Sequence, residues 1–371
     1  MNRIVAGPPA LARLWLATLA AALPFLFPHG ALAAPAGATM AVPFDSGSVR
    51  VTLITDEAEA ALTLLRTRDA KRSAADWERL WSSDGYRRLK RREAAMGRAF
   101  TDSAFAAFVR ADSTRARAAA YARTLETWSA ADLAGAGRRA LAYLPPRSII
   151  RAKVYLLIKP RTNSFVFDTE TDPAILLYLD PAVTPAKLEN TVAHELHHIG
   201  YAAACSAPAD TTLTPGARAA RQWLTAFGEG LAMLAAAGGP DHHPHEASPP
   251  EERARWDRDI AHASEDLRTL DRFLLDVATG RMSDPDSIRA RGMSFFGVQG
   301  PWYTVGYMMA QSIEQMMGRD ALLASVCDPV SLLETYNRAF APRMTCRLAP
   351  PKWSPELLAA LRARSAPRGS P

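Results

Sequence analysis

The sequence predicts an α+β fold that is predominantly helical, with a small β-sheet in the middle of the chain. Residues 56–142 are rich in Ala, Leu, Arg and Glu, and their large apolar residues recur at roughly the period of a helix. Three short runs of β-branched, leucine and aromatic residues follow, at 152–158, 164–167 and 175–179. From residue 185 onward the helical pattern returns. This order indicates a helical region, then a sheet, then a second helical region.

Turn-forming residues mark where these segments end. Residues 82–85 (SSDG) are expected to break the first helical region, and Pro145 and Pro146 to end it, because proline cannot continue a helix. The connections between the three expected strands are short, which suggests a small meander rather than β-α-β units. Residues 34–50, rich in Ala, Gly and Pro, are expected to form a short extended lead-in.

Start and stop signals divide the second helical region. Thr184 followed by Pro185 is a helix-start signal, with the threonine as N-cap. Residues 283–300 are expected to form a loop, and residues 347–371, rich in Pro and Arg, a frayed tail. Further helices, separated by glycine and proline, are expected at 215–237, 251–279, 301–317 and 331–340.

The N-terminus has the pattern of a signal peptide. Arg3 and Arg13 supply a positive flank, residues 14–27 an apolar core, and residues 31–33 the small residues of a cleavage site. The apolar run is shorter than the ~20 residues that span a bilayer. We therefore expect an exported protein, periplasmic or secreted, without stable membrane insertion. The expected regions are a signal peptide (1–33), a helical N-terminal region (34–150), a region with the metal-binding motif described below (151–346) and a tail (347–371).

Composition and charge exclude some classes of function. Hydrophobic residues make up 48% of the chain and charged residues 22%, as in an ordinary globular protein. The formal net charge is +6, or +4 without Arg3 and Arg13, which is too low to indicate nucleic-acid binding. The one basic run, residues 87–92, is expected to form the solvated face of a helix.

Three cysteines, Cys205, Cys327 and Cys346, permit one disulfide in an exported protein. Cys327 and Cys346 flank the expected helix 331–340 and could pair, which would leave Cys205 as a small buried apolar residue. The cysteines lack the C-x-x-C spacing of a structural zinc site.

The strongest chemical signal is the pattern H-E-x-x-H at residues 194–198. One helical turn separates His194 from His198, so both imidazoles project from one face of a helix and can bind a single Zn²⁺. Glu195 follows the first histidine, and its carboxylate can reach a water beside the metal rather than the metal itself. The expected strand 175–179 comes just before this helix, an order that would place a substrate-binding edge beside the zinc.

A catalytic zinc needs a third protein ligand and an open position for water. One common pattern places a glycine and a further histidine after the motif, but Tyr201 and Ala204 stand at those positions. The other common solution is a glutamate on a second helix, and Glu229 lies between two glycines in an otherwise Ala- and Leu-rich segment. Each glycine lowers the stability of a helix by about 1 kcal/mol relative to alanine. Such a cost is expected where helices must approach closely at the metal. The alternative is that Glu229 is a surface residue at a helix kink.

The two segments H-E-L-H-H and G-E-G-L-A resemble those of the gluzincin class of zinc metallopeptidases. From Trp77 to Phe340, the chain resembles exported bacterial proteins described as zinc-dependent peptidases of unknown function, with residues 81–86 and 303–307 among the shared features. The resemblance implies a zincin-like catalytic domain over residues 151–346. It also implies a peptide or protein substrate.

The same resemblance implies His194, His198 and Glu229 as zinc ligands and Glu195 as general base. The sequence departs from thermolysin-like enzymes at Met233, where those enzymes carry an aspartate that orients a metal-bound histidine. It also lacks the G-x-M-E-N stretch of one group of aminopeptidases.

Other residues are weaker candidates for the site. Tyr303 and Tyr307, one turn apart on an expected helix, could each donate to the oxyanion of the reaction, or could simply be packed aromatic residues. His197 points away from His198 around the helix and is expected beside the ligands or at the surface. The remaining histidines outside the leader are His242, His243 and His245 in an expected solvated loop, and His262, for which no partner is expected.

Four functions are consistent with these residues. The first is an exported zinc peptidase that uses Glu195 as general base. The second is a catalytically inactive relative that binds peptides, although the intact Glu195 argues against it. The third is a zinc hydrolase of non-peptide amides such as cell-wall cross-links, which would use the same chemistry. The fourth is a helical scaffold with a chance motif, which would bind no zinc. The sequence does not indicate the oligomeric state.

Overall fold

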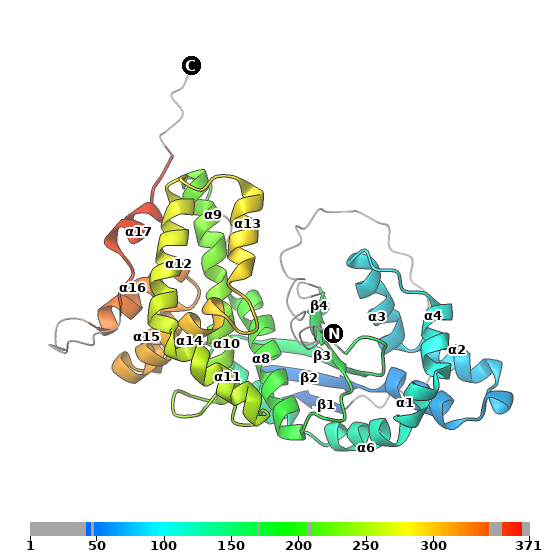
Figure 1. Ribbon diagram of the computed structural model, residues 1–371. Coiled ribbons are helices and arrows are strands. Elements are labelled where there is room, and N and C mark those ends of the chain that lie inside the picture. Colours follow the sequence, from blue (N-terminus) through cyan, green and yellow to red (C-terminus); the bar gives the residue numbers. More distant parts are fainter. Residues whose placement is uncertain are drawn as a thin grey trace, which may run out of the picture. The chain divides into compact units, whose positions relative to one another are not determined.

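The computed structural model describes the backbone of residues 42–45 and all of residues 48–162, 164–168, 171–205, 210–340 and 351–365 (Figure 1). Helices dominate, and a small sheet of five strands accompanies them, so the predicted α+β class is confirmed. The described residues form two compact units. The first consists of 42–45, 50–131 and 152–185, and the second of 48–49, 132–151 and the described residues from 186 onward. The expected signal peptide lies outside the described residues.

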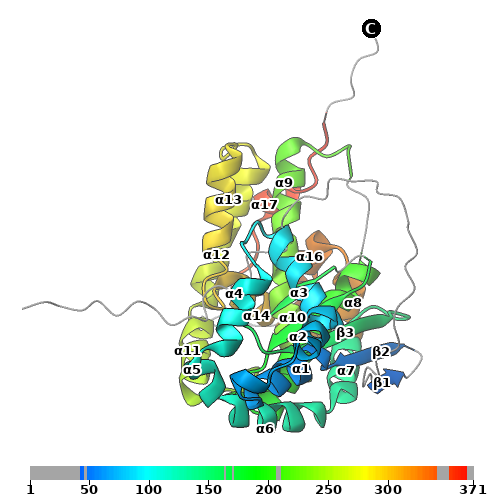
Figure 2. The ribbon, with the colours of Figure 1, turned by 90° about the vertical axis from the view of Figure 1, so that its right-hand side faces the viewer.

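Helix α1 (Asp56–Arg66) is central to the helical part of the first unit. It buries Ala58, Leu62 and Leu65 and packs against the helices that follow it (Figure 2). These helices are α2 (Ala74–Ser82), α3 (Asp84–Ala95), α4 (Asp102–Arg110), α5 (Asp112–Ala116) and α6 (Ala118–Ser129), and the short 3₁₀ helix η2 (Asp69–Lys71) lies between α1 and α2 in the chain. The break expected at residues 82–85 is confirmed, because the Ser83 hydroxyl accepts a hydrogen bond from the backbone N–H of Tyr86 and caps α3.

The basic run on α3 is only partly solvated, so the prediction for residues 87–92 is wrong for two of its arginines. Arg88 and Arg92 are one turn apart and both are buried. Arg88 forms ion pairs with Asp168 and Asp172, while Arg92 pairs with Glu93 at 2.8 Å and lies over an aromatic ring. Tertiary partners therefore compensate for the burial of these charges, and the basic run alone gave no sign of them.

The sheet has the strand order β1-β2-β3-β5-β4. Its strands are β1 (Val42–Asp45), β2 (Val49–Ile54), β3 (Ile150–Leu157), β4 (Phe165–Phe167) and β5 (Ala174–Tyr178). Strand β5 runs parallel to β3, with Leu177 opposite Leu156, and antiparallel to β4. The lead-in expected at 34–50 therefore contains β1 and the start of β2.

The expected meander is wrong, because β5 inserts between β3 and β4 instead of following β4 at the edge. All five residues of β5 are buried, as expected for a strand covered on both faces. The unbroken apolar run AILLY was the signal for such a central strand. The segment between β3 and β4 carries the chain past the place that β5 occupies.

The second unit is helical and has its own hydrophobic core, centred on α14 (Pro301–Met317), α10 (Gly228–Ala237) and α12 (Ala263–Ala278) (Figure 1). Trp302 and Phe227 are among its largest buried side chains. Its other helices are α7 (Leu133–Leu141), α8 (Pro185–Ala204), α9 (Pro215–Leu224), η3 (Thr225–Phe227), α11 (Pro250–Ala261), α13 (Pro285–Ser294), α15 (Arg319–Ser325), α16 (Pro329–Ala339) and α17 (Pro355–Ala360).

Several expected helices of this unit differ from the observed ones. The segment 215–237 is interrupted by η3, and the segment 251–279 divides at His262 into α11 and α12. The range 283–300 was expected to be a loop but contains α13, which Asp284 caps by accepting a hydrogen bond from Ser287 N. Asp284 followed by Pro285 was a start signal of the same kind as that at residues 184–185. The range 347–371, expected to be a tail, contains α17.

Helices α10 and α14 cross with their backbones in contact. A Cβ atom at Gly230 would lie 2.1 Å from Tyr307 N and 2.3 Å from the carbonyl carbon of Gly306. A Cβ atom at Gly228 would meet no atom within 4 Å. The expectation that glycine permits close helix packing is therefore met at Gly230 and not at Gly228.

The disulfide joins Cys205 to Cys327, with Cα atoms 4.8 Å apart. The pairing of Cys327 with Cys346 is therefore wrong, and Cys205 is not a free apolar residue. The C-terminal end of α8 lies beside the turn between α15 and α16, a proximity that spacing along the chain does not reveal. Cys346 itself lies outside the described residues. None of the helices within the described ranges is long and apolar enough to cross a bilayer.

We predict that Gly230→Ala destabilises the protein by about 1–3 kcal/mol, because the new methyl group would overlap backbone atoms of α14. The matched control is Gly228→Ala, which has room for the methyl group and should change the free energy of unfolding by less than about 1 kcal/mol. Urea unfolding of both variants measures the difference. Equal stability of the two variants would contradict the proposed backbone contact.

Candidate metal centre

Helix α8 presents the two histidines of the H-E-x-x-H pattern. The helix begins at Pro185, as predicted, and runs for 20 residues. His194 is buried and His198 is half-buried, and their rings lie 4.7 Å apart between centroids. Their four-residue spacing puts both Nε2 atoms on one side of the helix, 3.0 Å from each other.

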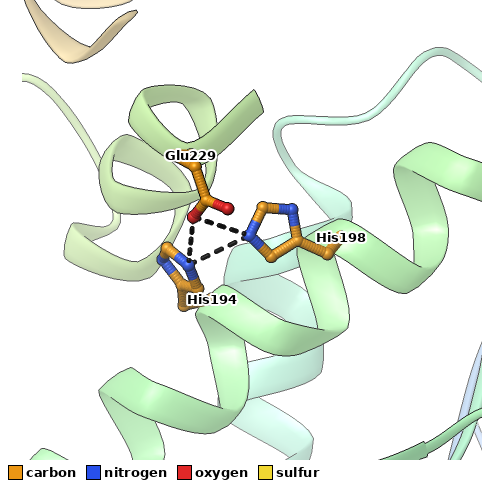
Figure 3. A group of neighbouring side chains, drawn as sticks. All are labelled: His194, His198 and Glu229. Carbon is orange, nitrogen blue, oxygen red and sulfur yellow. Dashed lines mark hydrogen bonds and ion pairs between the residues drawn. The ribbon is translucent and has the colours of Figure 1, made fainter. Parts of the chain in front are cut away.

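Glu229 reaches the same point from the first turn of α10 (Figure 3). Its Oε2 atom lies 3.3 Å from His194 Nε2 and 3.2 Å from His198 Nε2. The alternative of a surface residue at a kink is excluded, since Glu229 is only 8% exposed. Within the part of the chain that the structure describes, these three side chains form the one group of histidine, cysteine and acidic residues close enough to hold a metal ion.

The spacing of these three atoms fits a zinc ion. Zinc binds histidine nitrogen and carboxylate oxygen at about 2.0–2.2 Å, so tetrahedral ligand atoms lie roughly 3.3 Å from one another. The three observed separations are 3.0, 3.2 and 3.3 Å. Two histidines and one glutamate leave a fourth position open, as catalytic zinc sites do.

The charges around the three side chains favour an ionised Glu229. Burial opposes its ionisation, but the charge of His198 and the hydrogen bonds from both histidines outweigh it and hold the Glu229 pKa well below its usual range. Burial lowers the pKa of His194, whereas for His198 the attraction of Glu229 outweighs burial and raises the pKa. A negative carboxylate beside two ring nitrogens is the charge arrangement that a divalent cation requires.

Glu195 lies next to these residues without the pairing that Glu229 has. Its side chain is buried, and its Oε2 atom has no hydrogen-bond partner among the described residues. Burial raises the Glu195 pKa to about 8, with the charge of His198 opposing the shift and that of Glu229 adding to it. A buried carboxylate oxygen without a partner is costly, which suggests that it serves a group other than a protein side chain.

A model of the protein family described as "Putative zinc dependent peptidase (DUF5700)" matches residues 62–342, most of the chain. The chain belongs to this family. Zinc as the metal, predicted from the histidine spacing, agrees with the family description. The predicted likeness to zinc-dependent peptidases of unknown function is thereby confirmed. Neither a curated protein nor a solved structure matches the chain.

The two tyrosines proposed as donors in this family member have different surroundings. The Tyr303 ring stacks on His194, with centroids 6.5 Å apart, and its hydroxyl interacts with the Glu229 carboxylate. Burial, together with the charge of Glu229, raises the Tyr303 pKa well above its usual value, so the phenol keeps its proton. The Tyr307 hydroxyl instead donates to the carbonyl of His242 at 3.4 Å. The structure therefore brings Tyr303 to the candidate site and directs Tyr307 elsewhere.

His197 is fully buried, so the expectation of a surface position does not hold. Its Nε2 atom lies 3.2 Å from the carbonyl oxygen of Tyr143 and donates to it. Burial, reinforced by the charge of His198, lowers the His197 pKa to about 3. The ring also stacks on Tyr201. His197 thus fastens α8 to the segment that follows α7. Helical spacing separated it from the ligands, but no signal in the sequence gave its partner.

The loop histidines do not form a second metal site. His243 pairs with Asp257 at 2.9 Å, and His245 is buried with its Nδ1 atom 2.9 Å from the Ser248 hydroxyl. His242 is exposed, as expected for a solvated loop, whereas the buried position of His245 was not expected. His262 is exposed at the junction of α11 and α12.

We predict that Glu229→Ala weakens zinc binding about 100-fold or more, because roughly a third of the protein–metal bonds is lost. His262→Ala, which changes an exposed histidine far along the chain from the motif, should leave the affinity unchanged. Titration with a competing chelator, followed by metal analysis, measures the zinc affinity of each variant. Full-strength binding by Glu229→Ala would remove Glu229 from the site.

Proposed function

We propose that this protein is an exported zinc peptidase of the gluzincin type, with a zincin-like catalytic domain. The observation that carries the proposal is the convergence of His194, His198 and Glu229 at one point, with the buried carboxylate of Glu195 beside them. A glutamate from a second helix as third ligand is the feature that separates gluzincins from the histidine-rich pattern excluded by Tyr201 and Ala204. The substrate would be a peptide or protein.

Zinc held by these three side chains would lower the pKa of a bound water to about 7 and polarise the carbonyl group under attack. Glu195 would accept the proton of that water at Oε2, the atom without a partner in the protein. It would then pass the proton to the leaving nitrogen. Burial raises the pKa of Glu195, which makes its carboxylate a stronger proton acceptor than that of an ordinary glutamate and so suits its role as general base.

Tyr303 would donate a hydrogen bond to the oxyanion that develops during the attack. Its hydroxyl interacts with the Glu229 carboxylate, and its high pKa keeps it a donor. In the absence of substrate, the same contact would orient Glu229. Met233, with its apolar side chain, cannot supply an orienting contact of this kind. Tyr307 has a weaker claim, since its hydroxyl is engaged with the 242 carbonyl.

Export is supported by two independent features. The leader pattern at residues 1–33 has the charge, the apolar core and the cleavage residues of a signal peptide. The disulfide between Cys205 and Cys327 is of the kind that forms and persists in oxidising compartments. Both favour a periplasmic or secreted location.

We predict that Glu195→Gln abolishes casein hydrolysis, with a loss of at least about 100-fold, while zinc content stays at the wild-type level. The substitution keeps the shape of the side chain and removes its ability to take up a proton. Glu265→Gln, at an exposed position on α12, is the matched control and should retain full activity. Undiminished hydrolysis by zinc-loaded Glu195→Gln would end the proposed mechanism.

We further predict that Tyr303→Phe lowers kcat by about 10²–10³-fold, as expected for loss of one oxyanion donor. Tyr307→Phe removes a hydroxyl of the same kind one turn away and should change kcat by less than threefold, roughly the effect of a weak hydrogen bond. Steady-state kinetics on one peptide substrate compares the two. Similar losses in both variants, or a loss in Tyr307→Phe alone, would contradict the assignment of Tyr303.

A further inference from the structure

The turn at residues 295–300, between α13 and α14, has features that the proposed reaction does not use. It leads directly into α14, the helix that carries Tyr303. The backbone N–H of Tyr303 donates a hydrogen bond to Gly300 O at 2.8 Å. The turn is held by two further backbone hydrogen bonds, from Gly300 N to Phe296 O at 2.7 Å and from Trp302 N to Phe295 O at 3.3 Å. It therefore has a defined shape one helical turn from the residue that contacts Glu229.

Gln299 in this turn has a backbone conformation that glycine would adopt more easily. Its φ is +67°, and only two other non-glycine residues in the described ranges, Arg147 and Asp168, have a positive φ. Such a conformation is strained for a glutamine, which has neither the freedom of glycine nor the short side chain of asparagine. Strain of this kind concentrates where a side chain is needed at a fixed position.

The carboxamide of Gln299 lacks suitable hydrogen-bond partners. Its Nε2 atom lies 3.9 Å from Met233 Sδ, a weak acceptor, and its Oε1 atom is buried with no partner among the described residues. Met233 lies one turn after Glu229 on α10, so the carboxamide is near the helix of the third predicted ligand as well as that of Tyr303. A residue that served only to pack the turn would not require a polar group here.

The neighbour of Gln299 presents an apolar side chain to solvent. Val298 is 38% exposed and is one of four large hydrophobic residues that are exposed in the described part of the chain. Phe296, two residues earlier, is half-buried. The turn therefore places a carboxamide without a suitable partner next to an exposed apolar side chain.

We propose that Val298 and Gln299 bind the substrate on one side of the scissile bond. The half-buried Gln299 side chain would turn outward, which exposes Oε1, and its carboxamide would hydrogen-bond to a backbone amide of an extended peptide, because a peptide group carries the complementary donor and acceptor. Val298 would contact an apolar side chain of the same segment. One turn of α10 plus the Gln299 side chain spans roughly 10 Å, so the contact falls about two or three residues from the bond that is cleaved. This inference rests on the proposed peptidase function and adds a specificity element to it.

Kinetics on peptides of increasing length tests this proposal. Gln299→Met keeps the length and the apolar packing of the side chain but removes the carboxamide. It should raise KM about 10-fold for peptides long enough to reach the turn, and leave kcat, zinc content and cleavage of shorter peptides unchanged. Gln315→Met, at an exposed position of α14, is the matched control and should alter none of these values. Val298→Ser should reduce the preference for an apolar residue at one substrate position.

A second variant separates loss of binding from loss of folding. Gln299→Gly removes the side chain and relieves the backbone strain, so it should raise KM like Gln299→Met while unfolding at the same or a higher urea concentration than wild type. A wild-type KM in Gln299→Gly, or in Gln299→Met on long peptides, would overturn the inference and leave the peptidase function standing. Failure of the zinc-loaded wild type to cleave any peptide would instead refute the proposed function, and the inference with it.

Discussion

The backbone contact between α10 and α14 is the constraint on which the candidate site depends. Gly230 follows Glu229 directly, and its missing side chain lets α10 lie against Gly306 of α14. The contact holds Glu229 beside the two histidines and brings Tyr303 to the same carboxylate. One residue of the G-E-G segment therefore supplies a candidate ligand, and the next supplies the space that the ligand's helix requires.

The other helix of the site, α8, is fixed to the rest of the second unit at three points. His197 donates to the carbonyl of Tyr143, the Tyr201 hydroxyl donates to Val326 O at 3.1 Å, and Cys205 forms the disulfide. Successive members of this set are four residues apart, so the three attachments follow one another along the last turns of α8 and at its C-terminal end. Anchors of this kind hold a helix rigid, which is how a metal site keeps its geometry before the metal binds.

Much of the fold and of the candidate site could be predicted from local patterns. Helical periodicity, capping residues and proline breaks gave the starts of α1, α3 and α8 and both ends of α14, because these signals act within a few residues. They failed where a feature depends on distant partners. The burial of Arg88 and Arg92 needs carboxylates and an aromatic ring from elsewhere in the first unit, and the insertion of β5 between β3 and β4 depends on which edges remain to be paired.

The sequence by itself determined the mostly helical α+β class, the pair His194 and His198, and the neighbouring Glu195, because four residues of a helix make one turn whatever surrounds it. It offered Glu229 as a candidate only. The tertiary structure decided that Glu229 converges with the histidines, that Tyr303 rather than Tyr307 accompanies them, and that Cys205 pairs with Cys327. Each of these depends on the distance between helices far apart in the chain. Packing fixes such distances, and no spacing within the sequence encodes them.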